Sequence, residues 1–365
     1  MEYSDQLYQI AFTQLHGIGP VRARRILKLL KHPRDFFELN YSALQQLTSI
    51  PVAQLEKTER ANALWRAQGQ LPYLANDNLS YHFITDPSYP ARLRHCSDAP
   101  LGLFYRGSEP SWHHPRCIAV VGTRQQTAYG QRIVEELLAG LPKDIVVISG
   151  LALGVDANVH EQCLQQQLHT IGVLGHGIDR IYPASNRKLA LQMLEQGGLL
   201  SEFLIGTKPD RMHFPMRNRI IAGLADAVVV IESNKNGGSL ITAELGNDYN
   251  REVFAFPGPI QHPQSEGCHN LIKNQQAQLL TSAADLLTAM NWSVSQQIIE
   301  LENQKGLNTI QTQILSLFRN KNNWSIDELV LQIKQPVAQI SSNLFELELN
   351  GALQNIGANR YRLPL

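Results

Sequence analysis

The sequence predicts an α/β fold built on an extended, Rossmann-like parallel sheet, with a small helical module on either side. The main observation is that, from Ile118 onward, short β-branched runs alternate with segments of helical spacing. This alternation is typical of parallel strands covered by helices on both faces. The strand runs are IAVV, IVVIS, TIGVL, LLSEF, AVVVI and VFAF, which makes at least six strands. The expected helices between them span 128–139, 154–167, 185–196, 215–224 and 239–249.

The two ends of the chain differ in pattern from this central part. Residues 1–72 indicate short helices, with Gly17, Gly19 and Pro20 preceding the basic segment VRARRILKLLK, as in a helix-hairpin-helix module. We assign residues 73–290 to the sheet domain and the Gln- and Asn-rich residues 291–308 to a linker. Three helical segments and a Gly- and Asn-turned hairpin over 309–365 predict a winged helix.

Charge and composition limit the possible partners. Lys plus Arg and Asp plus Glu both number 32, so a nucleic-acid surface can come only from local clusters of cations. The first residues lack the basic and apolar regions of a secretory signal, and no run approaches the roughly 18 apolar residues of a membrane span. We therefore expect a cytoplasmic protein without membrane contact. Walker-type and metal-ligand spacings are absent from the sequence, so we expect no cofactor and no metal.

A candidate phosphate loop follows the first strand run. IAVV leads directly into Gly122, Thr123 and Arg124, and a helix is expected to begin a few residues later. A strand, loop and helix in this order direct backbone N–H groups and the positive end of a helix dipole at a ligand, and Arg124 adds a planar, permanently charged group. The alternative is that Gly122 only forms a tight turn and Arg124 pairs with a carboxylate. No G-x-G-x-x-G is present, so a dinucleotide is not indicated.

A second loop, SGLALGVD, also follows a strand run. Its glycines are interpreted as turn and packing residues, and Asp156 as a partner of the helix N-terminus. His160 is interpreted as a buried histidine rather than a catalytic base, because no nucleophile accompanies it.

A basic and aromatic segment lies at 205–220, in IGTKPDRMHFPMRNRI. It combines one aromatic residue, Phe214, with four cations and one acid, Asp210, which gives a local charge of 4 − 1 = +3. The cations are Lys208, Arg211, Arg217 and Arg219. An aromatic ring beside cations is suited to holding unpaired bases and their phosphates. The alternative is a solvated charged turn with Phe214 in the core.

Seven ordered motifs over about residues 73–280 resemble those of the DprA (Smf) family. They are IAVVGTRQQTAYG, SGLALGVDANVH, GHGIDRIYPASN, FPMRNRIIAGLADAVVVIES, GGSLITA, VFAFPG and EGCHNLI. The resemblance implies an extended Rossmann fold that is not an enzyme and that binds single-stranded DNA without sequence choice. It also implies a homodimer that loads the RecA recombinase onto incoming DNA during natural transformation. The flanking modules it implies are a helix-hairpin-helix or SAM-like module over residues 1–72 and a winged helix of the DML1 type at the end of the chain.

The resemblance further implies which residues contact DNA. Beyond those named above, Asn218 would join the pocket, and Asn186 and Arg187 would lie near it. Gly238 and Ser239 would belong to a phosphate-contacting loop, where this chain has Gly237 in place of the family's usual serine.

Two other functions are compatible with the same fold. Gly237 and Gly238 followed by Thr242 and Glu244 faintly resemble the signature of LOG-like nucleoside-monophosphate phosphoribohydrolases, although Leu240 stands where those enzymes have glycine. The second alternative is a scaffold that docks a recombinase and contacts DNA only incidentally.

The end modules carry separate expectations. The turn around Gly17 and Gly19 can offer N–H groups to a phosphate, or can serve packing alone. The last helical segment carries Glu346 and Glu348 and no Lys or Arg, so a phosphate backbone would repel it. We therefore expect that segment to have a protein-docking or regulatory role.

Overall fold

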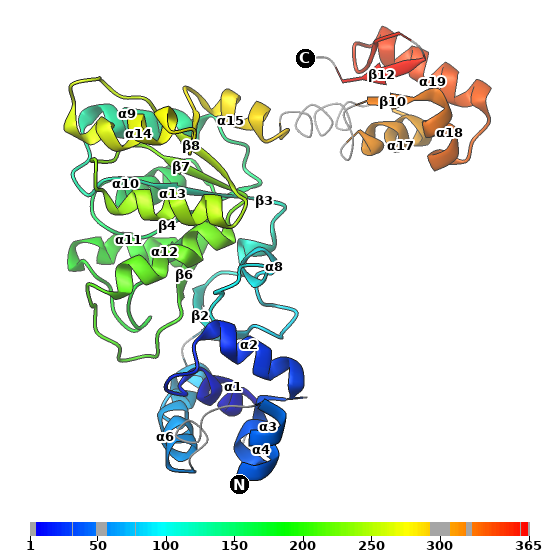
Figure 1. Cartoon of the computed structure of the whole chain (residues 1–365). Coiled ribbons are helices and arrows are strands. Elements are labelled where there is room, and N and C mark those ends of the chain that lie inside the picture. Colours follow the sequence, from blue (N-terminus) through cyan, green and yellow to red (C-terminus); the bar gives the residue numbers. More distant parts are fainter. Residues whose placement is uncertain are drawn as a thin grey trace. The chain divides into compact units, whose positions relative to one another are not determined.

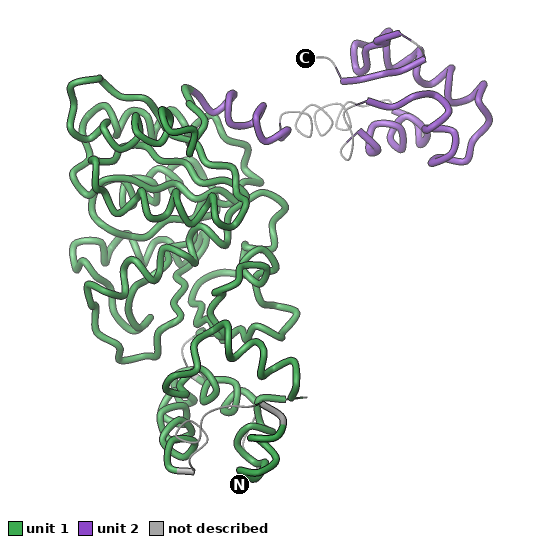
Figure 2. Tube along the Cα trace, viewed as in Figure 1, with its two compact units in different colours: residues 1–281 green, residues 282–365 purple. Residues whose placement is uncertain are grey.

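The computed structural model describes residues 5–30, 32–48, 57–76, 78–292, 307–318, 323–357 and 359–363. Its chain divides into two compact units, Met1–Thr281 and Ser282–Leu365, which Figure 2 distinguishes by colour. Most of the expected linker at 291–308 lies outside the described residues. The first unit contains both the N-terminal helices and the sheet, which share one continuous hydrophobic core.

A nine-stranded sheet organises the first unit, in the order β1-β2-β6-β5-β4-β3-β7-β8-β9. The strands from β6 to β9 along this order run parallel, whereas β1 and β2 are antiparallel additions at one edge. The bounds are β1 Leu79–Phe83, β2 Gly102–Gly107, β3 Arg116–Val121, β4 Ile145–Ser149, β5 Thr170–Val173, β6 Gly197–Ser201, β7 Ala227–Val230, β8 Glu252–Ala255 and β9 Gln278–Leu279. The predicted mostly parallel sheet is therefore confirmed, with three strands beyond the six runs.

Helices cover both faces of this sheet, because each parallel crossover carries one helix. Figure 1 shows α12 and α13 in front of the strands and α9 and α10 behind them. The bounds are α9 Ala128–Ala139, α10 Val155–Gln165, α11 Arg187–Gln196, α12 His213–Leu224, α13 Gly238–Asp248 and α14 Glu266–Lys273. The sequence predicted the first five of these to within about two residues at each end.

Helices alone form the N-terminal part of the first unit, as far as the structure describes it. They are α1 Asp5–Thr13, α2 Pro20–Leu29, α3 Pro33–Glu38, α4 Tyr41–Thr48, α6 Lys57–Gln68 and α7 Leu71–Asn76. Arg24 of α2 donates to the carbonyl oxygen of Arg94, and Gln70 accepts a bond from the Ile205 amide. These bonds tie the helical part to the sheet domain.

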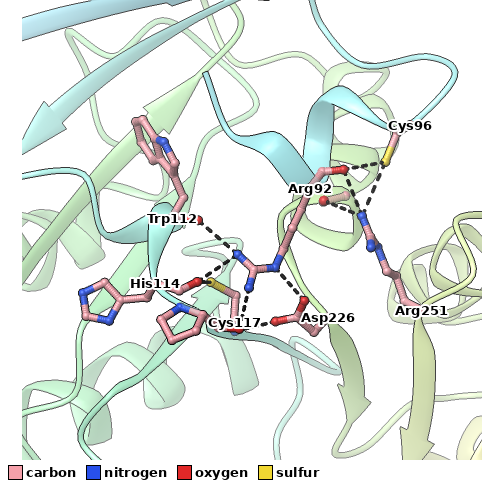
Figure 3. Close-up of polar contacts among 9 residues, drawn as sticks. Arg92, Cys96, Trp112, His114, Cys117, Asp226 and Arg251 are labelled. Atoms are coloured by element: carbon pink, nitrogen blue, oxygen red, sulfur yellow. Dashed lines mark hydrogen bonds and ion pairs between the residues drawn. The ribbon is translucent and has the colours of Figure 1, made fainter. Parts of the chain in front are cut away.

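The segment between β1 and β3, which includes the short helix α8 (Ala91–Arg94), is held to the sheet by Arg92 (Figure 3). Its Nε lies 2.6 Å from Asp226 Oδ1, and its Nη atoms donate to the carbonyl oxygens of Trp112, His114 and Pro115. Asp226 Oδ2 in turn accepts the Cys117 N–H of β3. Every nitrogen of this guanidinium is bonded within the chain, so Arg92 has a structural role.

The described part of the second unit begins with the helix α15, followed by three helices, α17, α18 and α19, around a separate core and by a small antiparallel sheet, ordered β10-β12-β11. The bounds are α15 Ala283–Ala289, α17 Thr309–Leu317, α18 Ile326–Ile333, α19 Val337–Leu349, β10 Asn323–Ser325, β11 Gln354–Asn355 and β12 Arg360–Arg362. The core residues include Phe318, Leu329 and Leu344. Within the part of the chain that the structure describes, no helix is both long and apolar enough to span a membrane.

Candidate nucleic-acid interface

A cleft opens where the strand order reverses, at the carboxyl ends of β3 and β7. The chain runs outward from β3 through β4, β5 and β6, then returns to build β7 and β8 on the other side of β3. Ligands of open α/β sheets bind at such a reversal. The cleft has a volume of about 600 Å³, and its walls come from the β3–α9 loop, the start of α12 and the start of α13.

The β3–α9 loop is held in place by Glu232, which is 2% exposed at the end of β7. Its backbone carbonyl accepts the Thr123 N–H at 2.8 Å, and its Oε2 accepts the Thr127 N–H at 2.9 Å. The Thr127 hydroxyl donates to Oε1 and caps α9 by accepting the Gly130 N–H. A carboxylate of the protein therefore already occupies the positive end of the α9 dipole, so this helix end is less available to a phosphate than the sequence suggested.

Gly122 serves packing at this turn. A Cβ at position 122 would stand 2.6 Å from Val155 Cγ2, so only glycine lets β3 end against the first residue of α10. Arg124 is exposed and has no carboxylate partner among the described residues. Arg124 lines the cleft, as do Gly122 and Thr123.

The start of α13 forms the opposite wall. No acidic residue lies in its first turn and no side chain caps it, so its positive end faces the cleft uncompensated. Ser239 donates to the Ser233 hydroxyl at 2.8 Å, and Asn218 donates to the Gly238 carbonyl at 3.3 Å. A Cβ at Gly237 would stand 2.2 Å from Ser233 Oγ, so the Ser233 hydroxyl occupies the space that a serine at position 237 would need.

Arg217 of α12 is the most unusual side chain of the cleft. It is 4% exposed, yet neither its Nε nor its Nη1 has a hydrogen-bond partner among the described residues. Burial lowers its pKa to about 10, with a nearby Asp156 acting in the opposite direction, so the group stays charged at neutral pH. Burial also raises the pKa of Asp156 above the usual carboxyl range. A buried cation whose N–H groups have no acceptor destabilises the folded state unless an anion pairs with it.

Two aromatic rings stand beside these cations. The Arg124 guanidinium carbon lies 5.5 Å from the centre of the Phe214 ring, within cation–π range, and the Tyr182 ring centre lies 5.9 Å from that of Phe214. Tyr182 is half exposed and lines the same cleft. The cleft thus pairs cationic donors with a π-surface.

The structure brings most of the predicted site residues together. Nine of them line the cleft: Gly122, Thr123, Arg124, Arg211, Phe214, Arg217, Asn218, Gly238 and Ser239. Four do not. Lys208 and Arg187 are exposed away from the cleft lining, and Asn186 is buried, where it donates to the carbonyl oxygens of Leu151 and Ala152. Arg219 points elsewhere, pairing with Glu202 and donating to the Asp98 carbonyl.

Sequence reasoning missed several residues at this site, among them Asp156, which lines the cleft. Tyr182 and Asn234 line the cleft, and Glu232 positions its loop. Tyr182 follows β5 by several residues, so only its place after the end of a strand could have indicated it. His160 is fully buried, bonds to Thr170 Oγ1 at 2.7 Å and has its pKa lowered by burial to about 3, so it is not a base open to solvent.

The fold and this cleft define an extended Rossmann-type protein with a cationic, aromatic-lined site at the switch point of its sheet. Residues 80–291 match the family described as DNA recombination-mediator protein A. The chain belongs to this family, whose description is that of a recombination mediator rather than an enzyme.

Relatives and solved structures agree with this assignment. The chain is 43% identical over 204 residues to DNA processing protein DprA of Streptococcus pneumoniae, covering 56% of this chain and 72% of that protein. It is 35% identical over 295 residues to Protein Smf of Synechocystis, covering 80% and 74%. The X-ray structure of DprA from S. pneumoniae superposes with a TM-score of 0.66 at 33% identity, covering 79% of this chain and 98% of that one. A DprA structure from Helicobacter pylori, described by its single-stranded DNA binding mode, superposes with a TM-score of 0.54 at 27% identity, covering 59% and 97%.

Proposed function

We propose that the chain binds single-stranded DNA in the switch-point cleft without sequence preference. The observation that carries this proposal is Arg217, a buried cation that lines the cleft and has two donor nitrogens without a hydrogen-bond partner among the described residues. A phosphate group supplies the acceptor oxygens and the negative charge that this guanidinium lacks. Arg124 and Arg211 add cations along the same walls.

The single strand is favoured over the duplex because of Phe214. Its ring is only partly exposed and lines a recessed surface, so a base must leave the duplex stack to reach it. Stacking on a π-face accepts every base, which gives binding without sequence choice. The likeness to a protein described by its single-stranded DNA binding mode supports the same ligand.

A salt titration tests this function. If about four phosphates are neutralised, a slope of about −0.7 per phosphate predicts roughly a fiftyfold drop in single-strand affinity from 50 to 200 mM salt. Matched duplex of the same length serves as the control and should bind more weakly at every salt concentration. Equal affinity for duplex and single strand, or a slope near zero, would remove the proposal.

We also propose the finer roles that the family resemblance implies. The protein would act in the cytoplasm as a homodimer and load the RecA recombinase onto incoming DNA during transformation. Residues 1–72 would form a helix-hairpin-helix or SAM-like module, and 309–365 a winged helix of the DML1 type. Phe345 and Leu349 are exposed on α19, and Glu346 and Glu348 are its only charged residues, which favours a protein rather than DNA as the partner of that helix.

The phosphoribohydrolase alternative is not favoured by the geometry. Its candidate catalytic carboxylate, Glu244, is exposed and lines a separate pocket with Lys235 and Asn270, whereas Thr242 lines the cleft. A carboxylate must reach the substrate to stabilise a developing positive charge. Incubation with AMP should therefore release no adenine.

A further inference from the structure

A second concave site lies outside the cleft, where the N-terminal helices meet the sheet domain. It has a volume of about 490 Å³ and is lined by Trp65, Arg66, Gln68, Gly69, Gln70 and Leu204. Trp65, near the end of α6, is 76% exposed. An indole ring left this open presents an apolar face on which a flat aromatic group can stack.

The loop 202–212 connects this pocket to the cleft. Leu204, near the start of the loop, lines the Trp65 pocket, and Arg211, near its end, lines the cleft. The loop is held on both sides, because the Ile205 N–H donates to Gln70 Oε1 and the Gly206 N–H donates to Asp179 Oδ1, each at 2.8 Å. The two sites therefore share one ordered segment of chain.

The loop carries two cations, Lys208 and Arg211, and two acids, Glu202 and Asp210, of which Glu202 is paired with Arg219. Lys208, between Leu204 and Arg211, is exposed and has no ion-pair partner among the described residues. No carboxylate is among the residues lining the pocket, while an arginine and two glutamines are. Arg66 itself is held by Glu59 at 3.2 Å, so Trp65 and Lys208 remain as the groups open to a ligand.

We propose that the Trp65 pocket is a second base-binding site for the same single strand. A base stacks on the Trp65 indole, and Lys208 contacts the phosphates between this base and the segment held in the cleft. The inference rests on the proposed function, since the strand is taken to occupy the cleft first. It assigns a role to the helical part of the chain and to Lys208, neither of which the cleft itself uses.

Oligonucleotide length tests this proposal. Trp65→Ala should leave the affinity for the shortest oligothymidines unchanged, because these fill only the cleft. As oligonucleotide length increases across about 4 to 16 nucleotides, the affinity of the variant should become about 5- to 150-fold lower than that of the unmodified protein. This factor is the contribution of one stacked base. Tyr73→Ala is the matched control, because Tyr73 is an exposed aromatic residue on α7 that does not line the pocket.

Fluorescence provides a second readout. Long oligothymidine should quench an emission component that Trp65→Phe removes, whereas Trp112, 2% exposed, should contribute no quenching. Equal affinity of Trp65→Ala and unmodified protein at every length, alongside abolished binding in Arg217→Met, would overturn the Trp65 site and leave the cleft intact. Unchanged binding in both variants would instead overturn the proposed function. A weakening that is equal at all lengths would show that Trp65 acts through the fold, and would also overturn the second site.

Discussion

The Arg124 guanidinium lies 5.5 Å from the centre of the Phe214 ring, so the loop after β3 and the start of α12 meet through a cation and an aromatic face. This contact orients both groups toward the same cleft before any ligand binds. A base that stacks on Phe214 would find a charged group for its phosphate within reach.

Phe214→Ala should weaken single-strand binding by about 1–3 kcal/mol, because it removes the stacking surface and leaves Arg124 without its ring contact. Phe214→Tyr keeps the ring and should bind nearly as well. Titration of both variants with a labelled oligonucleotide measures the difference. Equal weakening in the two variants would mean that the ring surface is not what the strand contacts.

Arg217→Met should abolish most single-strand binding, because it removes the cation that the cleft offers to a phosphate. It also leaves the buried Asp156 carboxylate without its nearby positive charge, which should lower thermal stability at neutral pH. The salt slope should also become shallower by about 0.7 for each phosphate that the variant no longer neutralises. Thermal unfolding and a salt titration give the two readouts.

Arg219→Met is the matched control for that variant. Arg219 pairs with Glu202 on the other side of α12, and both side chains are largely buried. Removing the arginine leaves the carboxylate unpaired, which should cost about 3–5 kcal/mol of folding stability. Single-strand affinity of the folded protein should change little. A strong decrease in affinity here at unchanged stability would place Arg219 in the interface after all.

These two arginines show how far sequence reasoning reached. The strands and helices of the central domain follow from hydrophobic periodicity, and the charge of the segment at 205–220 predicts a site there. Two residues along a helix correspond to a rotation of about 200° about its axis, so Arg217 and Arg219 point to nearly opposite sides of α12 and cannot face the same cleft. Charge content indicates the segment, but the side chain that faces the ligand depends on which face of α12 packs inward.

Other features depend on contacts between distant segments. Glu232 stabilises the loop at Thr123 from a strand more than a hundred residues away, which no local pattern indicates. The edge strand β9 has only two residues, too short for a recognisable alternation. Both arise from packing rather than from local propensity.

Asp156→Asn should strengthen single-strand binding several-fold at neutral pH. The carboxylate lines the cleft beside Arg217, where it repels a phosphate. Burial raises the pKa of Asp156 in the folded protein. The protonated group therefore contributes stability at low pH, and this contribution is lost as the pH rises through the folded pKa. Acidification through the raised pKa of Asp156 should therefore tighten binding in the unmodified protein more than in the variant. Parallel pH profiles without this difference would show that Asp156 does not face the bound strand.

Glu232→Ala and Glu232→Gln should separate the geometry of the β3–α9 loop from its charge. Alanine leaves the Thr127 N–H without its acceptor, which should cost about 1–3 kcal/mol of stability and let the loop that carries Arg124 move away from its binding position. Glutamine keeps an acceptor for that N–H, and its NH2 group can donate to the Thr127 hydroxyl instead of accepting from it, so it should preserve both stability and single-strand affinity. Hydrogen exchange of the Thr127 amide, followed with the binding titration, should be faster in the alanine variant only. If glutamine is as damaging as alanine, the negative charge at the start of α9 is what matters, and the positioning role of these two hydrogen bonds must be given up.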